Sequence, residues 1–156
     1  MLLVEFWTSA TPRSLEAICE GLVRQNVEQL ELAAARGQRL PRLYQSPTVY
    51  RRDPPGREWF RSLSRVYRPQ PSWCGLEDCA RCRTAPGLLG LDGPRLLWGD
   101  CDDLAGVVAA EHRHYGGLAS TVQVVQTSTP GLLHAVVRRP DGTTEDPTRI
   151  VRGLRP

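Results

Sequence analysis

Lysine is absent from this chain of 156 residues. All 20 of its lysine-plus-arginine residues are arginine. The absence excludes a P-loop lysine, a Schiff-base lysine and a lysine general base. Aromatic residues are also few, at 6%. No stretch approaches the roughly 18–20 apolar residues of a membrane span. The opening "MLLVEFWTSATP" lacks a basic segment before its short apolar run, so we expect neither a signal peptide nor membrane attachment.

The cysteines are odd in number. With five cysteines and no export signal, we expect reduced thiols in a cytoplasmic compartment. Charge is uneven, since residues 36–83 carry net +7, against −3 before them and −1 after them. Such a segment suits an acidic partner or nucleic acid. No nucleic-acid-binding motif accompanies the charge, so we expect a solvated arginine-rich surface and no nucleic acid partner.

Two segments have the signals of helices. Residues 11–37 have apolar residues near the helical period, with Thr11 as the expected N-cap and Gly37 as the expected stop. A second helix is expected from about Cys101 to His114, followed by two glycines. Both helices have an apolar stripe, so each should pack one face against the rest of the fold.

The remaining periodic segments predict strands. The first residues alternate, and residues 48–52 follow a proline-rich lead-in. "LASTVQVVQTS" predicts a strand, and "GLLHAVVRRPDGTTEDPTRI" predicts a hairpin around a Pro-Asp-Gly turn. The fold class is therefore α+β. We expect one domain, 1–156: an N-terminal helix and lead-in over 1–52, an irregular, basic, cysteine-containing insertion over 53–97, and a core over 98–156.

Cys101 lies between aspartates at the expected start of the second helix, in "WGDCDDLA". Asp100 is the expected N-cap, and Asp103 completes a start like a capping box. The first-turn N–H groups lower the pKa of a thiol, whereas neighbouring carboxylates raise it. A catalytic interpretation of Cys101 therefore requires a histidine partner.

His134 is the histidine that can serve as this partner. The other two lie about three turns down the same helix and cannot touch Cys101. His134 lies on the expected strand "LLHAVV", and across the Asp141-Gly142 turn Asp146 lies on the paired strand, directly opposite or one pair apart. Cross-strand neighbours are about 4.5–5.5 Å apart at Cβ. This geometry lets the Asp146 carboxylate orient the imidazole.

The strings "GDCDDLA", "LLHAVV" and "TEDPT", in this order, resemble the transglutaminase-like superfamily of papain-like thiol enzymes. The resemblance covers about residues 99–148. The upstream "LPRLYQSPTVYRRDPPGREWF" is similar to the lead-in of small members encoded by phages and prophages. The resemblance implies a papain-like core, in which the nucleophile helix packs on a small antiparallel sheet, and makes residues 98–156 the catalytic core.

The resemblance also assigns roles. It implies Cys101 as the nucleophile, His134 as the general base and acid, and Asp146 as the orienting carboxylate. The Cys101 backbone N–H and one further donor would hold the oxyanion. The candidates for that further donor are Gln45, Tyr50 and Trp98.

The expected function is hydrolysis of an amide or peptide bond in a protein or peptide substrate, through an acyl-enzyme and without a required cofactor. Acyl transfer to an amine is an alternative. A second alternative is a non-catalytic module that assembles with a phage structural protein through the basic segment 36–83. The expected location is the cytoplasm of a bacterial host, or a virion.

A zinc site is a further hypothesis, because Cys79 and Cys82 have C-x-x-C spacing and Cys74 adds a third thiol. Candidates for the fourth ligand are Cys19, His112 and His114. Reduced thiols or an opportunistic disulfide are the alternatives, since no second C-x-x-C is present.

The aspartates themselves suggest a rival cation site for Mg²⁺ or Ca²⁺. Consecutive helical residues point in different directions, and only Asp100 and Asp103 are expected to share a face. We therefore expect Asp102 to point elsewhere and the acids to serve the helix start.

Overall fold

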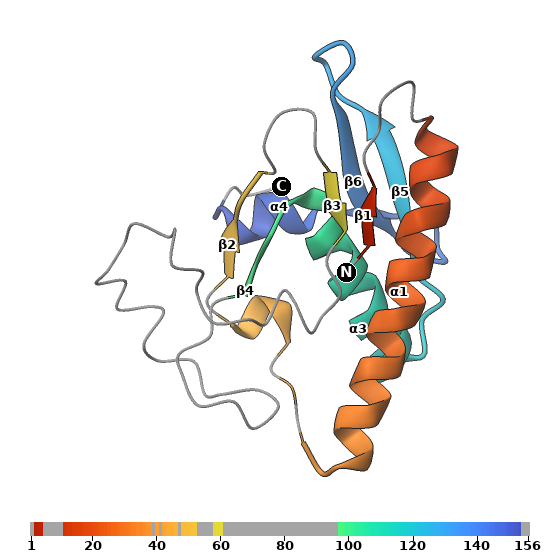
Figure 1. The fold of residues 1–156 in the computed structure, drawn as a ribbon, viewed down its shortest axis with the longest axis vertical. Helices are drawn as coiled ribbons and strands as arrows, with labels where there is room; N and C mark the ends of the chain where they lie inside the picture. Colours follow the sequence, from red (N-terminus) through yellow and green to blue (C-terminus); the bar gives the residue numbers. More distant parts are fainter. Residues whose placement is uncertain are drawn as a thin grey trace, which may run out of the picture.

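The computed structural model describes residues 2–4, 11–38, 40, 42–46, 48–52, 58–60 and 97–153. Its helices are α1 (Pro12–Ala35), α3 (Cys101–Gly116) and α4 (Pro147–Val151), with a 3-10 turn, η1 (Leu43–Gln45). Its strands are β1 (Leu2–Val4), β2 (Thr48–Tyr50), β3 (Glu58–Phe60), β4 (Leu97–Gly99), β5 (Thr121–Gln126), β6 (Leu133–Arg138) and β7 (Thr144–Glu145). Figure 1 shows the resulting α+β arrangement. Among the described residues, no helix has the length and hydrophobicity that a membrane crossing demands.

Helix α1 begins and ends where the sequence predicts. The Thr11 side chain accepts a hydrogen bond from the Ser14 N–H at 3.2 Å, and the Thr11 N–H donates to Ser14 Oγ at 3.0 Å. These reciprocal bonds satisfy two amide groups that the helix itself cannot pair. Gly37, just past the last turn, has φ +69°, a conformation that favours glycine.

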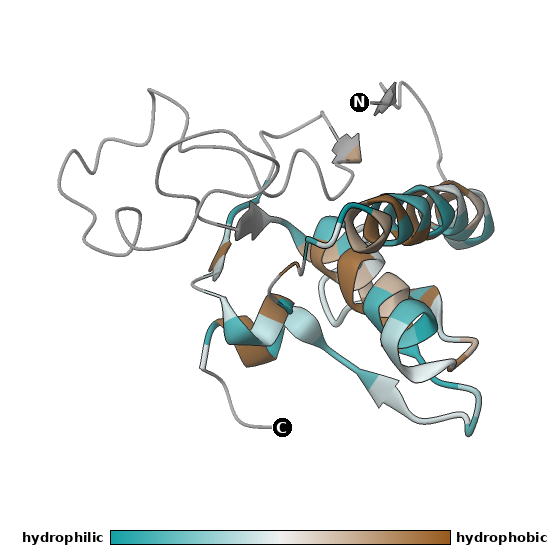
Figure 2. Ribbon diagram, turned by 90° about the horizontal axis from the view of Figure 1, so that it is seen from below, coloured by the Kyte–Doolittle hydropathy of each residue, from teal (hydrophilic) through white to brown (hydrophobic). Residues whose placement is uncertain are grey.

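The core lies where α1, α3 and the β5–β6 hairpin pack together. Its largest fully buried apolar side chains include Leu43, Leu104, Val23, Val107, Val108 and Val137. Helix α3 is buried at every position from 102 to 111, and Figure 2 shows its hydrophobic stretch lying against α1. The helices approach closely at Gly106, where an added Cβ would lie 2.9 Å from Leu22 Cδ2.

Strands β5, β6 and β7 form the predicted antiparallel sheet in sequence order. The turn between β6 and β7 contains Gly142 at φ +84°, and the Arg139 N–H closes it by donating to the Thr143 carbonyl at 2.9 Å. Strand β7 is only two residues long. The prediction that Asp146 lies on the paired strand was therefore wrong. Asp146 is the N-cap of α4, a helix that was not predicted from the sequence.

Two smaller sheets join segments that are distant in the sequence. Strand β1 pairs antiparallel with β3, and β2 pairs parallel with β4, Tyr50 opposite Gly99. The predicted strand 48–52 ends early, at Tyr50. The expected irregular region 53–97 contains β3 and the first residue of β4, while its other residues lie outside the described part. Because β2 pairs with β4, Tyr50 lies opposite Gly99, two residues before α3 begins at Cys101.

Candidate active site

Cys101 is the first residue of α3, directly after β4 and the predicted N-cap Asp100. The Asp100 N–H donates to Asp103 Oδ2 at 3.4 Å, which is one half of the expected capping box. Gly99 permits this approach, because a Cβ there would lie 2.6 Å from Asp103 Cβ. The Cys101 side chain is half-buried and packs against the core. The local sequence thus fixes a partly accessible thiol at a helix N-terminus.

The carboxylates around Cys101 converge more than the sequence reasoning allowed. Asp100, Asp102 and Asp103 are all buried, and each offers an oxygen within 4.8 Å of the others. The expectation that only two of them share a face was wrong, because an N-cap side chain need not follow the helical direction of the residues behind it. Within the described residues, these three carboxylates are the group with the spacing of cation ligands.

The structure brings His134 and Asp146 together. Nε2 of His134 lies 3.0 Å from Asp146 Oδ2, and both side chains are about one-fifth exposed, at 22% and 23%. Strand β6 pairs Val137 with Glu145, so Asp146 would continue opposite Val136 and meets His134 diagonally. The contact is the predicted one, but the register places it two residues from direct opposition. The diagonal remains within reach of these side chains.

Helix α4 holds the Asp146 carboxylate in place. Oδ1 accepts hydrogen bonds from the N–H groups of Thr148 at 3.0 Å and Arg149 at 3.3 Å. Oδ2 is the oxygen that meets His134. Among the described residues, the imidazole of His134 makes no other hydrogen bond, so its Nδ1 is the nitrogen open to a reacting proton. The carboxylate is therefore oriented by backbone and can in turn orient the ring.

Cys101 and His134 lie on two elements that pack against each other. Helix α3 packs along β6, which carries His134, and it also contacts α4, which Asp146 caps. In Figure 1 the first turn of α3 lies next to α4. The helix that Cys101 begins therefore packs against both the strand that carries His134 and the helix that Asp146 caps.

Among the oxyanion candidates whose side chains the structure describes, Tyr50 is the one with Cys101 in its surroundings. Burial raises the pKa of Tyr50, and the negative charge of the Cys101 thiolate raises it further, while the Arg52 guanidinium lowers it. Gln45 is the last residue of η1 and is exposed. The Trp98 side chain lies outside the described residues, although its backbone pairs with Val49.

The predicted zinc ligands Cys74, Cys79 and Cys82 lie outside the described residues. Of the suggested fourth ligands, Cys19 is fully buried in the core. His112 has Nδ1 3.0 Å from Ser120 Oγ and Nε2 3.6 Å from Glu145 Oε2, so both ring nitrogens face protein groups. His114 stacks edge-on against Tyr115, with ring centroids 4.6 Å apart.

A second polar cluster, centred on Glu145, was missed by the sequence reasoning. Its carboxylate accepts hydrogen bonds from Tyr44 Oη and from Arg139 Nη2, and it faces His112. Burial is the largest cause of the raised pKa of Tyr44 and of the lowered pKa of His112. Only tertiary contacts between η1, α3 and β7 create this cluster, so no local sequence signal announces it.

This second cluster has the residue types of a Ser-His-acid triad, but not the accessibility. The Ser120 side chain is fully buried, so a substrate carbonyl cannot reach its hydroxyl. Nearby, Glu111 Oε1 accepts a hydrogen bond from the Leu43 N–H at 2.7 Å, and burial raises the pKa of Glu111 to about 7. We interpret these contacts as structural ties between η1, α3 and the hairpin.

Comparison of the chain with protein-family models, with curated proteins and with solved structures found no match.

Proposed function

We propose that this protein is a thiol-dependent hydrolase of an amide or peptide bond, with a papain-like arrangement of the transglutaminase-like kind. Cys101 is the nucleophile, His134 the general base and acid, and Asp146 the orienting carboxylate. The observation that carries the proposal is the 3.0 Å contact between His134 and an Asp146 carboxylate that α4 holds by its backbone. That pair lies on the strand and helix that pack against the Cys101 helix.

The proposed reaction divides the work among these groups. Cys101 Sγ attacks the carbonyl carbon while Nδ1 of His134 takes the thiol proton, and Asp146 stabilises the imidazolium through Nε2. The Cys101 backbone N–H and the Tyr50 hydroxyl donate to the developing oxyanion. His134 then returns its proton to the leaving amine, and water, activated by the same histidine, releases the acid from the thioester.

The resolving nucleophile distinguishes hydrolysis from acyl transfer. Water converts the acyl-enzyme to an acid, whereas an added amine converts it to a new amide. Both reactions release the original amine of the substrate. With a glutamine peptide and an added primary amine, both reactions release ammonia, and the mass of the peptide product separates a glutamate formed by hydrolysis from an N-substituted glutamine formed by transfer. We favour hydrolysis. Because the chain has no lysine, cross-linking by acyl transfer would need a side-chain amine from another protein.

The pH dependence of alkylation at Cys101, followed site by site by mass spectrometry, tests the proposed pair. We expect wild-type labelling by iodoacetamide to persist well below the ordinary thiol pKa of about 8.5, because an imidazolium stabilises the thiolate. In His134→Ala the profile should shift upward. His114→Ala removes a histidine further down α3 and should behave as wild type. Ordinary labelling that is indifferent to His134 would refute the enzyme proposal.

A further inference from the structure

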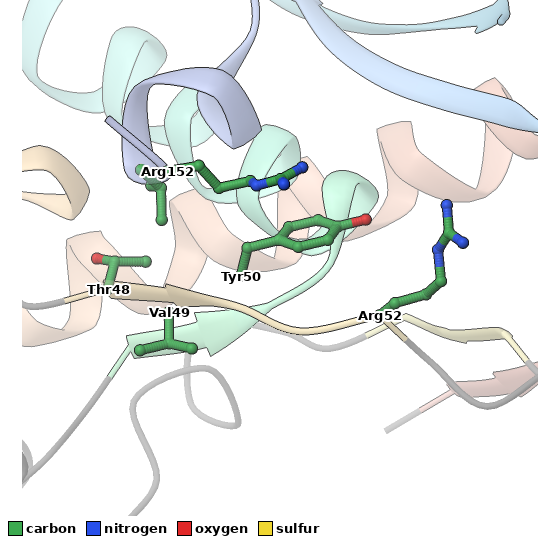
Figure 3. Close-up of a pocket in the computed structure, with 6 residues that line it drawn as sticks. Thr48, Val49, Tyr50, Arg52 and Arg152 are labelled. Carbon is green, nitrogen blue, oxygen red and sulfur yellow. The ribbon is translucent and has the colours of Figure 1, made fainter. Parts of the chain in front are cut away.

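A pocket opens between β2 and the end of α4, close to the proposed nucleophile. It has a volume of about 610 Å³ and is lined by Thr48, Val49, Tyr50, Arg52, Val151 and Arg152 (Figure 3). This volume is within the range of pockets that hold small ligands or a substrate side chain. The mechanism proposed above uses only one of these residues, Tyr50, so the rest of the pocket has no role yet.

Two guanidinium groups set the charge of this pocket. Among its described lining residues, Arg52 and Arg152 are the only charged side chains, and both residues are exposed. The Arg152 guanidinium lies over the Tyr50 ring, 5.9 Å from its centroid, within the range of a cation–π contact. Figure 3 shows Tyr50 between the two arginines. A pair of arginines beside a phenol is well suited to bind a carboxylate.

The pocket shares Tyr50 with the surroundings of Cys101. Tyr50 and Val151, which line it, pack with Cys101 against the same core cluster. Helix α4 contacts both β2 and α3, so it links the pocket to the helix that Cys101 begins. The charge of Cys101 also contributes to the raised pKa of Tyr50. Through Tyr50, a ligand in the pocket would therefore lie in the neighbourhood of the Cys101 thiol.

We propose that this pocket is a substrate subsite for a carboxylate, so that the enzyme prefers peptides with an acidic group close to the scissile bond. This inference rests on the proposed function. The three aspartates at the start of α3 carry the opposite charge, but they are at most 5% exposed and do not line the pocket. An incoming acidic peptide therefore meets the arginines first.

Two alkylating reagents of nearly equal size test the charge preference directly. Iodoacetate is anionic and iodoacetamide is neutral, and each loses iodide as its carbon bonds to the Cys101 sulfur. We expect the ratio of iodoacetate to iodoacetamide rates at Cys101 in the folded protein to exceed that in the urea-unfolded chain by about threefold or more, because the arginines concentrate anions. A ratio equal to or below that of the unfolded chain would overturn the inference.

Arginine variants identify the source of the preference. Arg52→Gln and Arg152→Gln should each lower the ratio towards its unfolded value, and 0.5 M salt should do the same in the wild type. Any change in the thiolate population affects both reagents equally and cancels in the ratio. Arg24→Gln, on the exposed face of α1, is the matched control for loss of one charge and should leave the ratio unchanged. An unchanged ratio in both pocket variants would contradict the inference.

A peptide pair tests the substrate class. Acetyl-Ala-Glu-Ala-amide should slow iodoacetamide labelling of Cys101 more than its glutamine counterpart does, and Arg52→Gln should remove the difference. Equal protection, or protection by oligothymidylate in place of the acidic peptide, would overturn the assignment. The His134→Ala profile is measured with iodoacetamide alone, so failure of the catalytic proposal and failure of this subsite give different results.

Discussion

Asp146 serves two partners with its two carboxylate oxygens, one in the backbone of α4 and one in the imidazole of His134. A substitution to alanine removes both contacts, so it cannot separate folding from catalysis. Asparagine keeps a side-chain oxygen for the N-cap, where it is as favourable as aspartate. It also loses the negative charge that stabilises an imidazolium.

We therefore expect Asp146→Asn to retain the free energy of unfolding to within about 0.5 kcal/mol, while alkylation of Cys101 at pH 6 slows by at least about tenfold. Urea denaturation and site-resolved mass spectrometry measure the two effects. Asp141→Asn, in the exposed turn between β6 and β7, is the matched control and should not change the alkylation rate. Normal labelling in Asp146→Asn would remove Asp146 from the proposed triad.

At the residue scale, local neighbours decided what could be predicted. Thr11 and Asp100 were identified as N-caps because capping depends on residues within one turn. The proximity of Tyr50 to Cys101 could not be predicted, because it depends on which strand lies beside β4. The convergence of Asp102 with its neighbours was also missed, since ideal helical directions do not hold at a helix start.

At the scale of elements, the segment from β4 to α3 depends on one glycine. An alanine at position 99 would place its Cβ 2.6 Å from Asp103 Cβ, and that atom cannot move without moving α3. The clash would displace the Asp103 carboxylate that accepts from the Asp100 N–H. The start of α3 would then lose its capping interaction.

We expect Gly99→Ala to lower the free energy of unfolding by about 1–3 kcal/mol, and to slow iodoacetamide labelling of Cys101 at pH 6. Thermal and urea denaturation check the first effect. Gly21→Ala is the control, because its Cβ would meet nothing within 4 Å in the middle of α1. That variant should be more stable by about 0.5–1 kcal/mol. Equal stability of the two variants would contradict the steric argument.

The sequence predicted the long elements and missed those defined by tertiary pairing. Helices α1 and α3 and the β5–β6–β7 sheet follow from periodicity and from turn residues. The residues of α4 were taken for part of the second hairpin strand, although an aspartate followed by a proline is also a helix start. The parallel pairing of β2 with β4 joins residues 48 and 97, and three-residue strands have too little pattern to show such a partner.

At the scale of the whole molecule, Glu111 couples stability to pH. Burial raises its pKa from 4.5 to about 7, assisted by the nearby charge of Glu145 and opposed by the Leu43 N–H and Arg42. A raised folded-state pKa means that the folded protein binds the proton more tightly than the unfolded chain does. The stabilising contribution is therefore complete below about pH 4.5 and is lost as the pH rises through about 7.

Glu111→Gln should not lose stability as the pH rises, because its amide does not ionise. The amide oxygen can still accept the hydrogen bond from the Leu43 N–H. Relative to the wild type, its free energy of unfolding should rise by up to about 3 kcal/mol between pH 4.5 and pH 8. The comparison with the wild type cancels the opposite effect of His112, whose pKa is lowered by burial. Urea denaturation at both pH values measures the difference, and Glu31→Gln, exposed on α1, is the control. If the difference in free energy of unfolding between Glu111→Gln and the wild type is the same at both pH values, the proposed linkage to Glu111 is contradicted.

The capping of α4 by the residue that orients His134 has a thermal consequence for the enzyme proposed here. Helix α4 has five residues, so it can open locally at a lower free energy than the whole fold requires. Each opening releases the Asp146 carboxylate and lets the imidazole rotate away from its productive orientation. Heating therefore depletes the competent population before the core melts, and activity has its own, lower transition temperature than the fold.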